Sequence, residues 1–129
     1  MKKTLATIVL VLTAAFGLTA CSAPVSSVPV SSSPHAITAD TVVIDVRTPA
    51  EYQAGHLEGA INIDAQSEAF EGLVTALPSD GDYVLYCSTG NRSGSAVARM
   101  TDLGFTSLTD AGGLNEASAS TGLTVVATP

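Results

Sequence analysis

The sequence predicts a single α/β domain, with a mostly parallel sheet flanked by helices. Its length of 129 residues suits one domain rather than two. Short β-branched runs alternate with segments of helical periodicity, which is typical of strands joined by helices. The first run, 41–46, is apolar at nearly every position, as expected for a strand buried on both faces of a parallel sheet. An apolar fraction of 46% without tryptophan predicts a small core built mainly from Val, Ile, Leu and Ala.

The first 20 residues have the three parts of a secretory signal peptide. Lys2 and Lys3 give a positive start, an apolar run covers 5–18, and small residues precede Cys21. The run is shorter than the roughly 20 apolar residues that a stable membrane span needs. We therefore expect residues 1–20 to be removed on export.

The end of this segment, Leu18-Thr19-Ala20-Cys21, resembles the lipobox of bacterial lipoproteins. The resemblance implies cleavage just before Cys21, a lipid on Cys21, and an extracytoplasmic protein anchored to a bacterial membrane. An ordinary cleaved signal followed by a passenger cysteine is the alternative. Residues 21–34, rich in Ser and Pro, are then a tether, and 35–129 form the domain.

The acidic balance of the chain argues against two kinds of partner. The formal net charge is −7, and both lysines lie in the predicted signal peptide, so the mature chain keeps three arginines against 12 acidic residues, a net charge of −9. Such a chain is a poor candidate for binding nucleic acid or an anionic membrane surface. Because cations are scarce, each arginine is informative.

A short helix is predicted to begin at Pro49. Thr48 precedes it as the N-cap, and proline is favoured at the first helical position. Glu51 stands three residues after Thr48 and completes a capping box, so we interpret it as a partner of the helix cap. Gly55 is expected to end this helix.

The rest of the domain is predicted to continue the alternation of strands and helices. Gly112-Gly113 is expected to form a turn, and one more helical turn with a loose tail is expected from Glu116. The remaining predicted elements are strands at 60–63, 83–87 and 106–109, helices at 65–77 and 96–103, and a loop at 88–93.

Cys87 ends the predicted strand 83–87. With Cys21 lipidated, Cys87 has no intramolecular disulfide partner, which marks it as reactive or intermolecularly paired; a buried cysteine acting as a small hydrophobe is the alternative. Working sites of such sheets lie beyond the carboxyl ends of the strands, where Cys87 is expected to sit. No metal site is predicted, since His35, His56 and Cys87 lack ligand spacing.

The segment after Cys87 is suited to activating a thiol. A short loop that leads directly into a helix can point successive amides inward as an anion-binding nest, and the helix adds its positive N-terminal end. Gly90 permits the backbone torsions of a tight curl, and Arg92 adds a positive charge. These features favour the thiolate of Cys87 over the thiol, which makes the cysteine nucleophilic near neutral pH.

Two segments resemble single-domain rhodaneses, the family of thiosulfate sulfurtransferases. One is the loop Cys-Ser-Thr-Gly-Asn-Arg-Ser at 87–93, and the other is 43–63. Gly104-Phe105 and Gly112-Gly113 are similar to later landmarks of the family, so the resemblance covers about 42–113. Within the longer segment, the matching pieces are Asp45-Val46-Arg47, Glu51-Tyr52, Gly55-His56-Leu57 and Gly59-Ala60-Ile61-Asn62.

The resemblance implies sulfur transfer through Cys87. Its thiolate would take the outer sulfur of a donor such as thiosulfate, become a persulfide and pass the sulfur to cyanide or a thiol, without a metal or an organic cofactor. Arg92 is implied to hold the anionic donor and support the thiolate. Arg47 could line the pocket mouth, although an acid and an arginine at a strand end more often brace neighbouring loops. The loop residues implied to cradle the sulfur are Ser88, Thr89, Gly90, Asn91 and Ser93.

The sequence departs from the family pattern in three places. Less chain than usual precedes the Asp-Val-Arg strand, which predicts a shortened N-terminal edge of the sheet. Residues 114–117 lack a tryptophan that many members carry after the Gly-Gly pair, and Asp64 replaces a frequent proline. We expect these departures to affect stability and substrate access rather than the chemistry of the loop.

Three other functions compete with a small-molecule sulfurtransferase. A cysteine phosphatase or arsenate reductase usually has five residues between its cysteine and arginine, whereas four separate Cys87 from Arg92, and this tighter loop favours sulfur. A non-enzymatic rhodanese-like binding module is disfavoured because the cysteine is present. An extracytoplasmic sulfur carrier that acts on a protein acceptor would share the persulfide and stays open.

Overall fold

The computed structural model of the protein describes residues 36–129, which belong to one compact unit, Ser31–Pro129. The predicted signal peptide, Cys21 and the tether lie outside the described residues. The elements, in chain order, are β1 (Thr41–Asp45), α1 (Pro49–Ala54), β2 (His56–Leu57), β3 (Ile61–Asn62), α2 (Phe70–Val74), β4 (Asp82–Cys87), α3 (Asn91–Asp102), β5 (Ser107–Gly113), α4 (Leu114–Thr121) and β6 (Val125–Val126).

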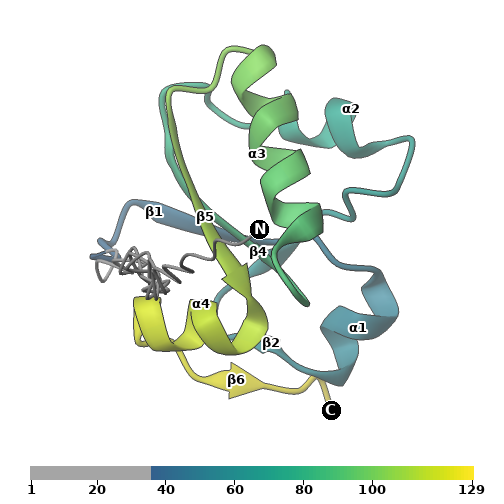
Figure 1. Cartoon of the computed structure of the whole chain (residues 1–129), viewed down its shortest axis with the longest axis vertical. Coiled ribbons are helices and arrows are strands. Elements are labelled where there is room, and N and C mark those ends of the chain that lie inside the picture. The colour runs from purple at the N-terminus through teal and green to yellow at the C-terminus, as the bar shows by residue number, and fades with distance from the viewer. Residues whose placement is uncertain (1–35) are drawn as a thin grey trace, which may run out of the picture. The chain divides into compact units, whose positions relative to one another are not determined.

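Four parallel strands form the main sheet, in the order β3-β1-β4-β5 (Figure 1). Strand β1 pairs with β4 along its whole length, so that Val43 lies opposite Val84. A second, two-stranded antiparallel sheet joins β2 to β6. The predicted α/β class with a mostly parallel sheet is confirmed. Residues 36–40 form neither strand nor helix, which agrees with the predicted shortened N-terminal edge.

Side chains of alternate β4 residues are buried on opposite faces of the main sheet. Tyr83, Leu85 and Cys87 join one apolar cluster, which also contains residues of α2 and α3. Val84 and Tyr86 join a second cluster, with residues of β2 and α4. Figure 1 shows α2 and α3 on one side of the sheet and α4 with β2 on the other. Burial on both faces is the reason that these strands are almost continuously apolar.

The centre of the core is more aromatic than the composition predicts. Its largest fully buried side chains are Tyr83, Tyr86 and Phe70. Buried hydroxyls need partners, and both tyrosines have one: Tyr83 donates to the carbonyl of Pro78 at 2.7 Å, and the Tyr86 hydroxyl accepts from the amide of Leu57 at 2.9 Å. Most of the buried hydrophobic residues are nevertheless Val, Ile, Leu or Ala, so the predicted mainly aliphatic core is confirmed, with these aromatic rings as its largest members.

Helix α2 is much shorter than the predicted helix 65–77. Residues 65–69 form turns and a bend, the helix lacks a side-chain N-cap, and Leu73 is half exposed. Arg99 of α3 explains part of the difference. Its guanidinium lies over the Phe70 ring and donates to the carbonyl of Ala65 at 2.8 Å, which holds the chain before α2 outside a helical path.

Helix α3 begins at Asn91, so the predicted loop 88–93 is shorter than expected and Arg92 and Ser93 belong to the first helical turn. The helix ends as predicted, with Gly104 beyond it at a φ of 95°. With 12 residues α3 is the longest helix in 36–129, and none of the helices in that range is long and apolar enough to cross a membrane.

The C-terminal region is more ordered than predicted. Gly112 and Gly113 do not form a free turn: they end β5, and Gly113 is the N-cap of α4. The amide of Gly113 donates to the Glu116 carboxylate at 2.7 Å, which satisfies a free group at the start of α4. In place of a loose tail, α4 runs for eight residues and β6 then pairs with β2.

Candidate active site

Cys87 is the last residue of β4 and is 1% exposed. The chain curls back immediately after it, and the amide of Gly90 donates to its Sγ at 3.0 Å. The start of α3 follows directly, so the sulfur lies where loop amides and a helix N-terminus converge. The prediction that Cys87 stands at a strand end before a curled loop and a helix is confirmed.

Gly90 makes the curl possible. Its φ of 93° lies in the left-handed region, which costs residues with a Cβ about 1–2 kcal/mol. A Cβ at this position would touch the Gly112 Cα at 3.5 Å, an ordinary contact, so the requirement for glycine comes mainly from the backbone torsion.

The surroundings of Cys87 lower the pKa of its thiol. Burial acts in the opposite direction and raises the pKa, but hydrogen bonds outweigh it. They come from the amide of Ser93, the amide of Thr89, the Ser93 hydroxyl and the amide of Gly90, in decreasing order. Since the thiolate is the nucleophilic form, this environment activates the cysteine.

Ser93 has a second partner that the sequence did not predict. Its buried hydroxyl lies 2.6 Å from Oδ1 of Asp110 and 3.0 Å from the carbonyl of Gly90. The same Asp110 oxygen accepts the amide of Gly112 at 3.0 Å. Asp110 therefore ties the end of β5 to the first turn of α3. No local motif marks this role, because Asp110 lies 17 residues from Ser93.

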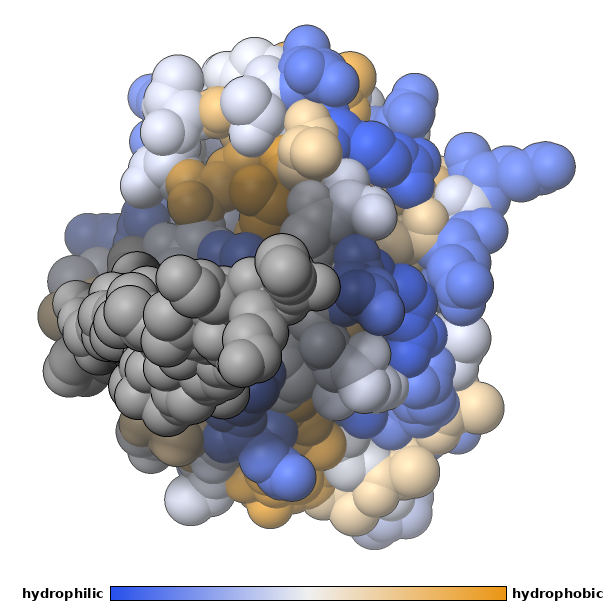
Figure 2. All heavy atoms as spheres, viewed as in Figure 1, coloured by the Kyte–Doolittle hydropathy of each residue, from blue (hydrophilic) through white to orange (hydrophobic). Residues whose placement is uncertain are grey.

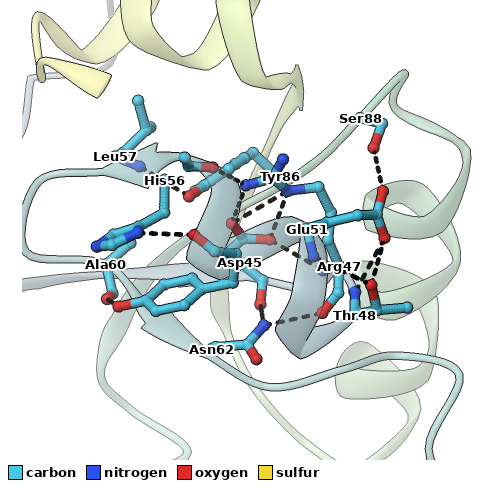
Figure 3. Close-up of polar contacts among 12 residues, drawn as sticks. Asp45, Arg47, Thr48, Glu51, His56, Leu57, Ala60, Asn62, Tyr86 and Ser88 are labelled. Carbon is cyan, nitrogen blue, oxygen red and sulfur yellow. Dashed lines mark hydrogen bonds and ion pairs between the residues drawn. The ribbon is translucent and has the colours of Figure 1, made fainter. Parts of the chain in front are cut away.

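Arg92 faces Glu51 rather than standing free beside the sulfur. Its Nη1 and Nη2 donate to the two carboxylate oxygens of Glu51 at 2.8 and 2.7 Å, and Nη2 also lies 2.8 Å from the Ser88 hydroxyl. Ser88 in turn donates to Glu51 at 2.8 Å, and Figure 3 shows Glu51 reaching both Thr48 and Ser88. The capping box of α1 is confirmed. Its carboxylate also serves the catalytic loop, which the capping motif did not reveal.

Arg47 is 6% exposed and forms a buried pair with Asp45, with 2.6 Å between Nη2 and Oδ2 (Figure 3). The Arg47 guanidinium also donates to the carbonyl of Gly55, and Asn62 donates to the carbonyls of Asp45 and Arg47. The hydrogen bond to Asp45 raises the pKa of Arg47 against the effect of burial. Arg47 therefore braces β1 against the segments that follow it.

A pocket of about 480 Å³ opens beside the loop. Arg47 reaches its wall as well as its buried pair, so it lines the pocket mouth in addition to bracing the strand. Residues at the start of α4 form the opposite wall, where the sequence lacks the tryptophan of many family members. The lining residues are Arg47, Ser88, Thr89, Gly113, Leu114, Asn115 and Glu116.

The predicted site residues lie around the end of β4, but their contacts differ. Ser93 and Gly90 contact Cys87, Ser88 and Thr89 line the pocket, and Asn91 is the exposed first residue of α3. Their contacts with a substrate stay predictions. Within 36–129, no three His, Cys, Asp or Glu side chains gather as a metal site would require.

Comparison with known proteins identifies the family. The rhodanese-like domain family matches residues 34–119. The thiosulfate sulfurtransferase PspE of Escherichia coli is 43% identical over 74 residues, which are 57% of this chain and 70% of PspE. The chain belongs to the rhodanese-like domain family. Several of its relatives carry the name sulfurtransferase, and it is a rhodanese-like enzyme.

Two further similarities bear on the fold and on a rival function. A solved structure of a rhodanese with anions from E. coli superposes with a TM-score of 0.57 at 32% identity, and covers 67% of this chain and 98% of that one. The bovine M-phase inducer phosphatase 1 is 35% identical over 63 residues, which are 45% of this chain but 12% of the phosphatase. Part of this chain is thus similar in sequence to part of a phosphatase.

Proposed function

We propose that this protein transfers a sulfane sulfur from a donor such as thiosulfate to a thiol or cyanide, through a persulfide on Cys87. The observation that carries the proposal is the environment of the sulfur: the Gly90 amide at 3.0 Å and the hydrogen bonds that lower the pKa of the thiol. Membership of the rhodanese-like family supports the same chemistry.

The reaction has two half-steps that balance without an oxidant. The Cys87 thiolate attacks the outer sulfur of thiosulfate, a new S–S bond forms, and the old one breaks as sulfite leaves with the electron pair. The thiolate of an acceptor, or cyanide, then attacks the terminal sulfur of the persulfide and releases the Cys87 thiolate. The amides of the loop would hold the negative terminal sulfur between the steps. This proposal involves no metal or organic cofactor.

Phosphate-monoester hydrolysis is the second candidate, because M-phase inducer phosphatase 1 is 35% identical over 63 residues, 45% of this chain. The short spacing between Cys87 and Arg92 favours a single sulfur atom over a tetrahedral oxyanion. A sulfur carrier that serves a protein acceptor would form the same persulfide, and a binding module would form none.

Intact mass separates these functions. The chain from Ser22 onward, mixed with excess thiosulfate, is expected to gain one sulfur, roughly 32 Da, and to lose it on adding cyanide. A Cys87→Ser variant should show no gain. No adduct with several sulfane donors would contradict the proposal, and hydrolysis of a phosphate monoester in the same preparation would favour the phosphatase. A persulfide that cyanide and small thiols leave intact would favour a protein acceptor.

We also propose that the protein is exported and held at the extracytoplasmic face of a bacterial membrane through a lipid on Cys21. The Leu-Thr-Ala-Cys sequence supports this proposal. Two or more acyl chains give a durable anchor, because each buried methylene contributes about 0.8 kcal/mol. Labelling of the protein with a radioactive fatty acid in a bacterial host, abolished by Cys21→Ser, tests it. Unlabelled protein would favour an ordinary cleaved signal.

A further inference from the structure

The described residues have no uncompensated side-chain cation. They contain three arginines and no lysine, and each arginine pairs with a carboxylate: Arg47 with Asp45, Arg92 with Glu51 and Arg99 with Glu71. Hydrophilic residues cover the side of the view on which α1 lies (Figure 2), and the arginine of the α1–α3 contact, Arg92, is paired with Glu51. A dianion that approaches Cys87 therefore meets loop amides but no free positive charge.

Arg92 is the arginine that could have attracted an anion to Cys87. Its pKa is raised first by the hydrogen bonds to Glu51 and further by the charges of Cys87 and Asp64, so it lies within electrostatic reach of the sulfur. Both terminal nitrogens of the Arg92 guanidinium donate to the Glu51 carboxylate, and Nη2 also donates to the Ser88 hydroxyl. Such pairs are the strongest and most directional of ion pairs.

The Glu51 carboxylate is bonded not only to Arg92 but also to Thr48, the N-cap of α1. The amide and hydroxyl of Thr48 donate to its Oε2 at 3.1 and 2.9 Å. Together with Arg92 these contacts hold the pKa of Glu51 well below its usual range. The carboxylate is consequently charged at every pH at which Cys87 reacts, and the first turn of α1 keeps it against Arg92.

We infer that Glu51 is a specificity-determining residue that acts through Arg92: by neutralising Arg92, the cation that bonds to Ser88 of the Cys87 loop, it biases the site against dianionic sulfur donors and toward donors of lower charge, such as monoanionic thiosulfonates. The donor class rests on the proposed sulfur transfer. The charge bias at Cys87 does not, and it is measurable without any sulfur donor.

Alkylation of Cys87 by two reagents tests the bias directly. Iodoacetamide is neutral and iodoacetate is an anion, and the same thiolate attacks the CH2 carbon of both and displaces iodide, so the ratio of their rates cancels any change in thiol pKa. The full chain is used in mild detergent, with Cys21→Ser in every variant so that Cys87 is the only thiol. Glu51→Gln keeps a residue that can cap α1 and bond to Arg92, but removes the charge.

The expected order of the iodoacetate-to-iodoacetamide rate ratios among the variants follows from their charges alone. Glu51→Gln leaves Arg92 unbalanced and should raise the iodoacetate-to-iodoacetamide ratio about threefold to tenfold, the factor expected for one unit charge about 4 Å away when solvent screens the interaction as bulk water does. Arg92→Gln should lower the ratio below that of the wild type. The double variant restores neutrality and should return to the wild-type ratio. High salt, which screens charges, should shrink all of these differences.

Glu71→Gln is the matched control, because it removes the carboxylate of another arginine pair, with Arg99, outside the site. It should leave the ratio unchanged. A ratio that Glu51→Gln leaves unchanged or lowers, or a double variant that differs from the wild type as much as the single ones, would overturn the inference. If Glu51→Gln fails to fold, the double variant still decides: removing a balanced pair keeps the wild-type ratio, whereas a lower ratio would show that Glu51 does not neutralise Arg92.

Sulfur donors that differ by one charge then test the donor class. Thiosulfate is a dianion and the methanethiosulfonate anion is a monoanion, and both leave a persulfide on Cys87. Glu51→Gln should raise kcat/KM for thiosulfate about threefold or more relative to methanethiosulfonate, mainly through KM. Equal changes for both donors would contradict the donor class. If no donor forms a persulfide while the alkylation order holds, the proposed function fails and the charge bias stands.

Discussion

At the scale of single residues, the chemistry depends on how Cys87 is solvated. Amides largely take the place of water around the sulfur: Cys87 is 1% exposed, and Gly90, Thr89 and Ser93 supply hydrogen bonds. Burial in an apolar site would have favoured the neutral thiol. The amides reverse this preference because they stabilise the charged form at a short distance, which turns a core cysteine into a nucleophile.

The first prediction concerns the pH dependence of Cys87. Because its pKa is lowered, the rate of alkylation by iodoacetamide should reach half of its maximum at a lower pH than for a free cysteine, which titrates near 8.5. The rate falls as the pH drops through the thiol pKa, since the thiolate is then protonated. A stopped alkylation series from pH 5 to 10, with glutathione as the reference, measures the midpoint. A midpoint at or above that of glutathione would contradict the assignment.

A second prediction isolates the hydroxyl of Ser93. Ser93→Ala removes one of the hydrogen bonds that favour the thiolate, so the alkylation midpoint of Cys87 should move to higher pH. Ser95→Ala is the control, because the Ser95 hydroxyl lies on the same helix and donates to the carbonyl of Asn91 instead. The same titration is run on both variants. Equal midpoints for Ser93→Ala and Ser95→Ala would show that the hydroxyl does not serve the sulfur.

Residue-level prediction from the sequence succeeded where the determinants were close together in the chain. Cys87 and its loop form one contiguous motif, and Thr48 with Glu51 forms another. The partners of Arg92 and Ser93 escaped notice because Glu51 lies 41 residues from Arg92 and Asp110 lies 17 residues from Ser93. Acidic residues are common in this chain, and no spacing rule selects one of them as the partner of a distant arginine.

At the scale of elements, local signals were reliable only where a cap or a breaker marked the boundary. Helix α1 has a capping box and begins at the predicted proline. Helix α2 lacks a side-chain cap, and its apolar spacing suggested more helix than the fold permits. Helix α4 begins at Leu114, and its N-cap, Gly113, has no side chain that would have indicated the cap from the sequence, so the start of the helix depends on the Glu116 carboxylate.

The third prediction compares two glycines of left-handed conformation. Gly90→Ala and Gly104→Ala should each cost about 1–2 kcal/mol of unfolding free energy, because φ is 93° and 95°. Only Gly90 belongs to the loop that donates to Cys87, so only Gly90→Ala should also slow persulfide formation. Urea unfolding and persulfide kinetics on both variants measure the two effects. If both variants lost a comparable fraction of the rate of persulfide formation, backbone strain at either glycine would be enough to reduce activity, and the Gly90 amide would have no special role.

At the scale of the whole domain, one buried ion pair joins the sheet to the site. Asp45 is fully buried at the end of β1, and Arg47 links it to the carbonyl of Gly55 while reaching the pocket wall. Its guanidinium carbon also lies 5.6 Å from the centre of the Tyr86 ring on the neighbouring strand. A buried charge is tolerable only with its partner, so this pair makes the edge of the pocket dependent on the core.

The fourth prediction is that Asp45→Asn destabilises the domain by about 3–5 kcal/mol, because it leaves Arg47 buried without a counter-charge. Glu71→Gln breaks the more exposed pair with Arg99 and should cost less than about 1 kcal/mol. Urea unfolding monitored by circular dichroism compares them. Adding Arg47→Met to Asp45→Asn should recover part of the loss. Similar costs for Asp45→Asn and Glu71→Gln would refute the idea that burial distinguishes the two pairs.

The sequence by itself determined the fold class and the order of most elements, and it predicted the nucleophile and the loop that follows it. Each of these follows from residues that are neighbours in the chain or from a simple period, because strand burial, helix caps and tight turns are local in origin. The tertiary structure alone decided three other features: the neutralisation of Arg92 by Glu51, the anchoring of Ser93 to Asp110, and the pairing of β6 with β2. These contacts join groups that only chain folding brings together, and their energies depend on distance and burial rather than on spacing in the sequence.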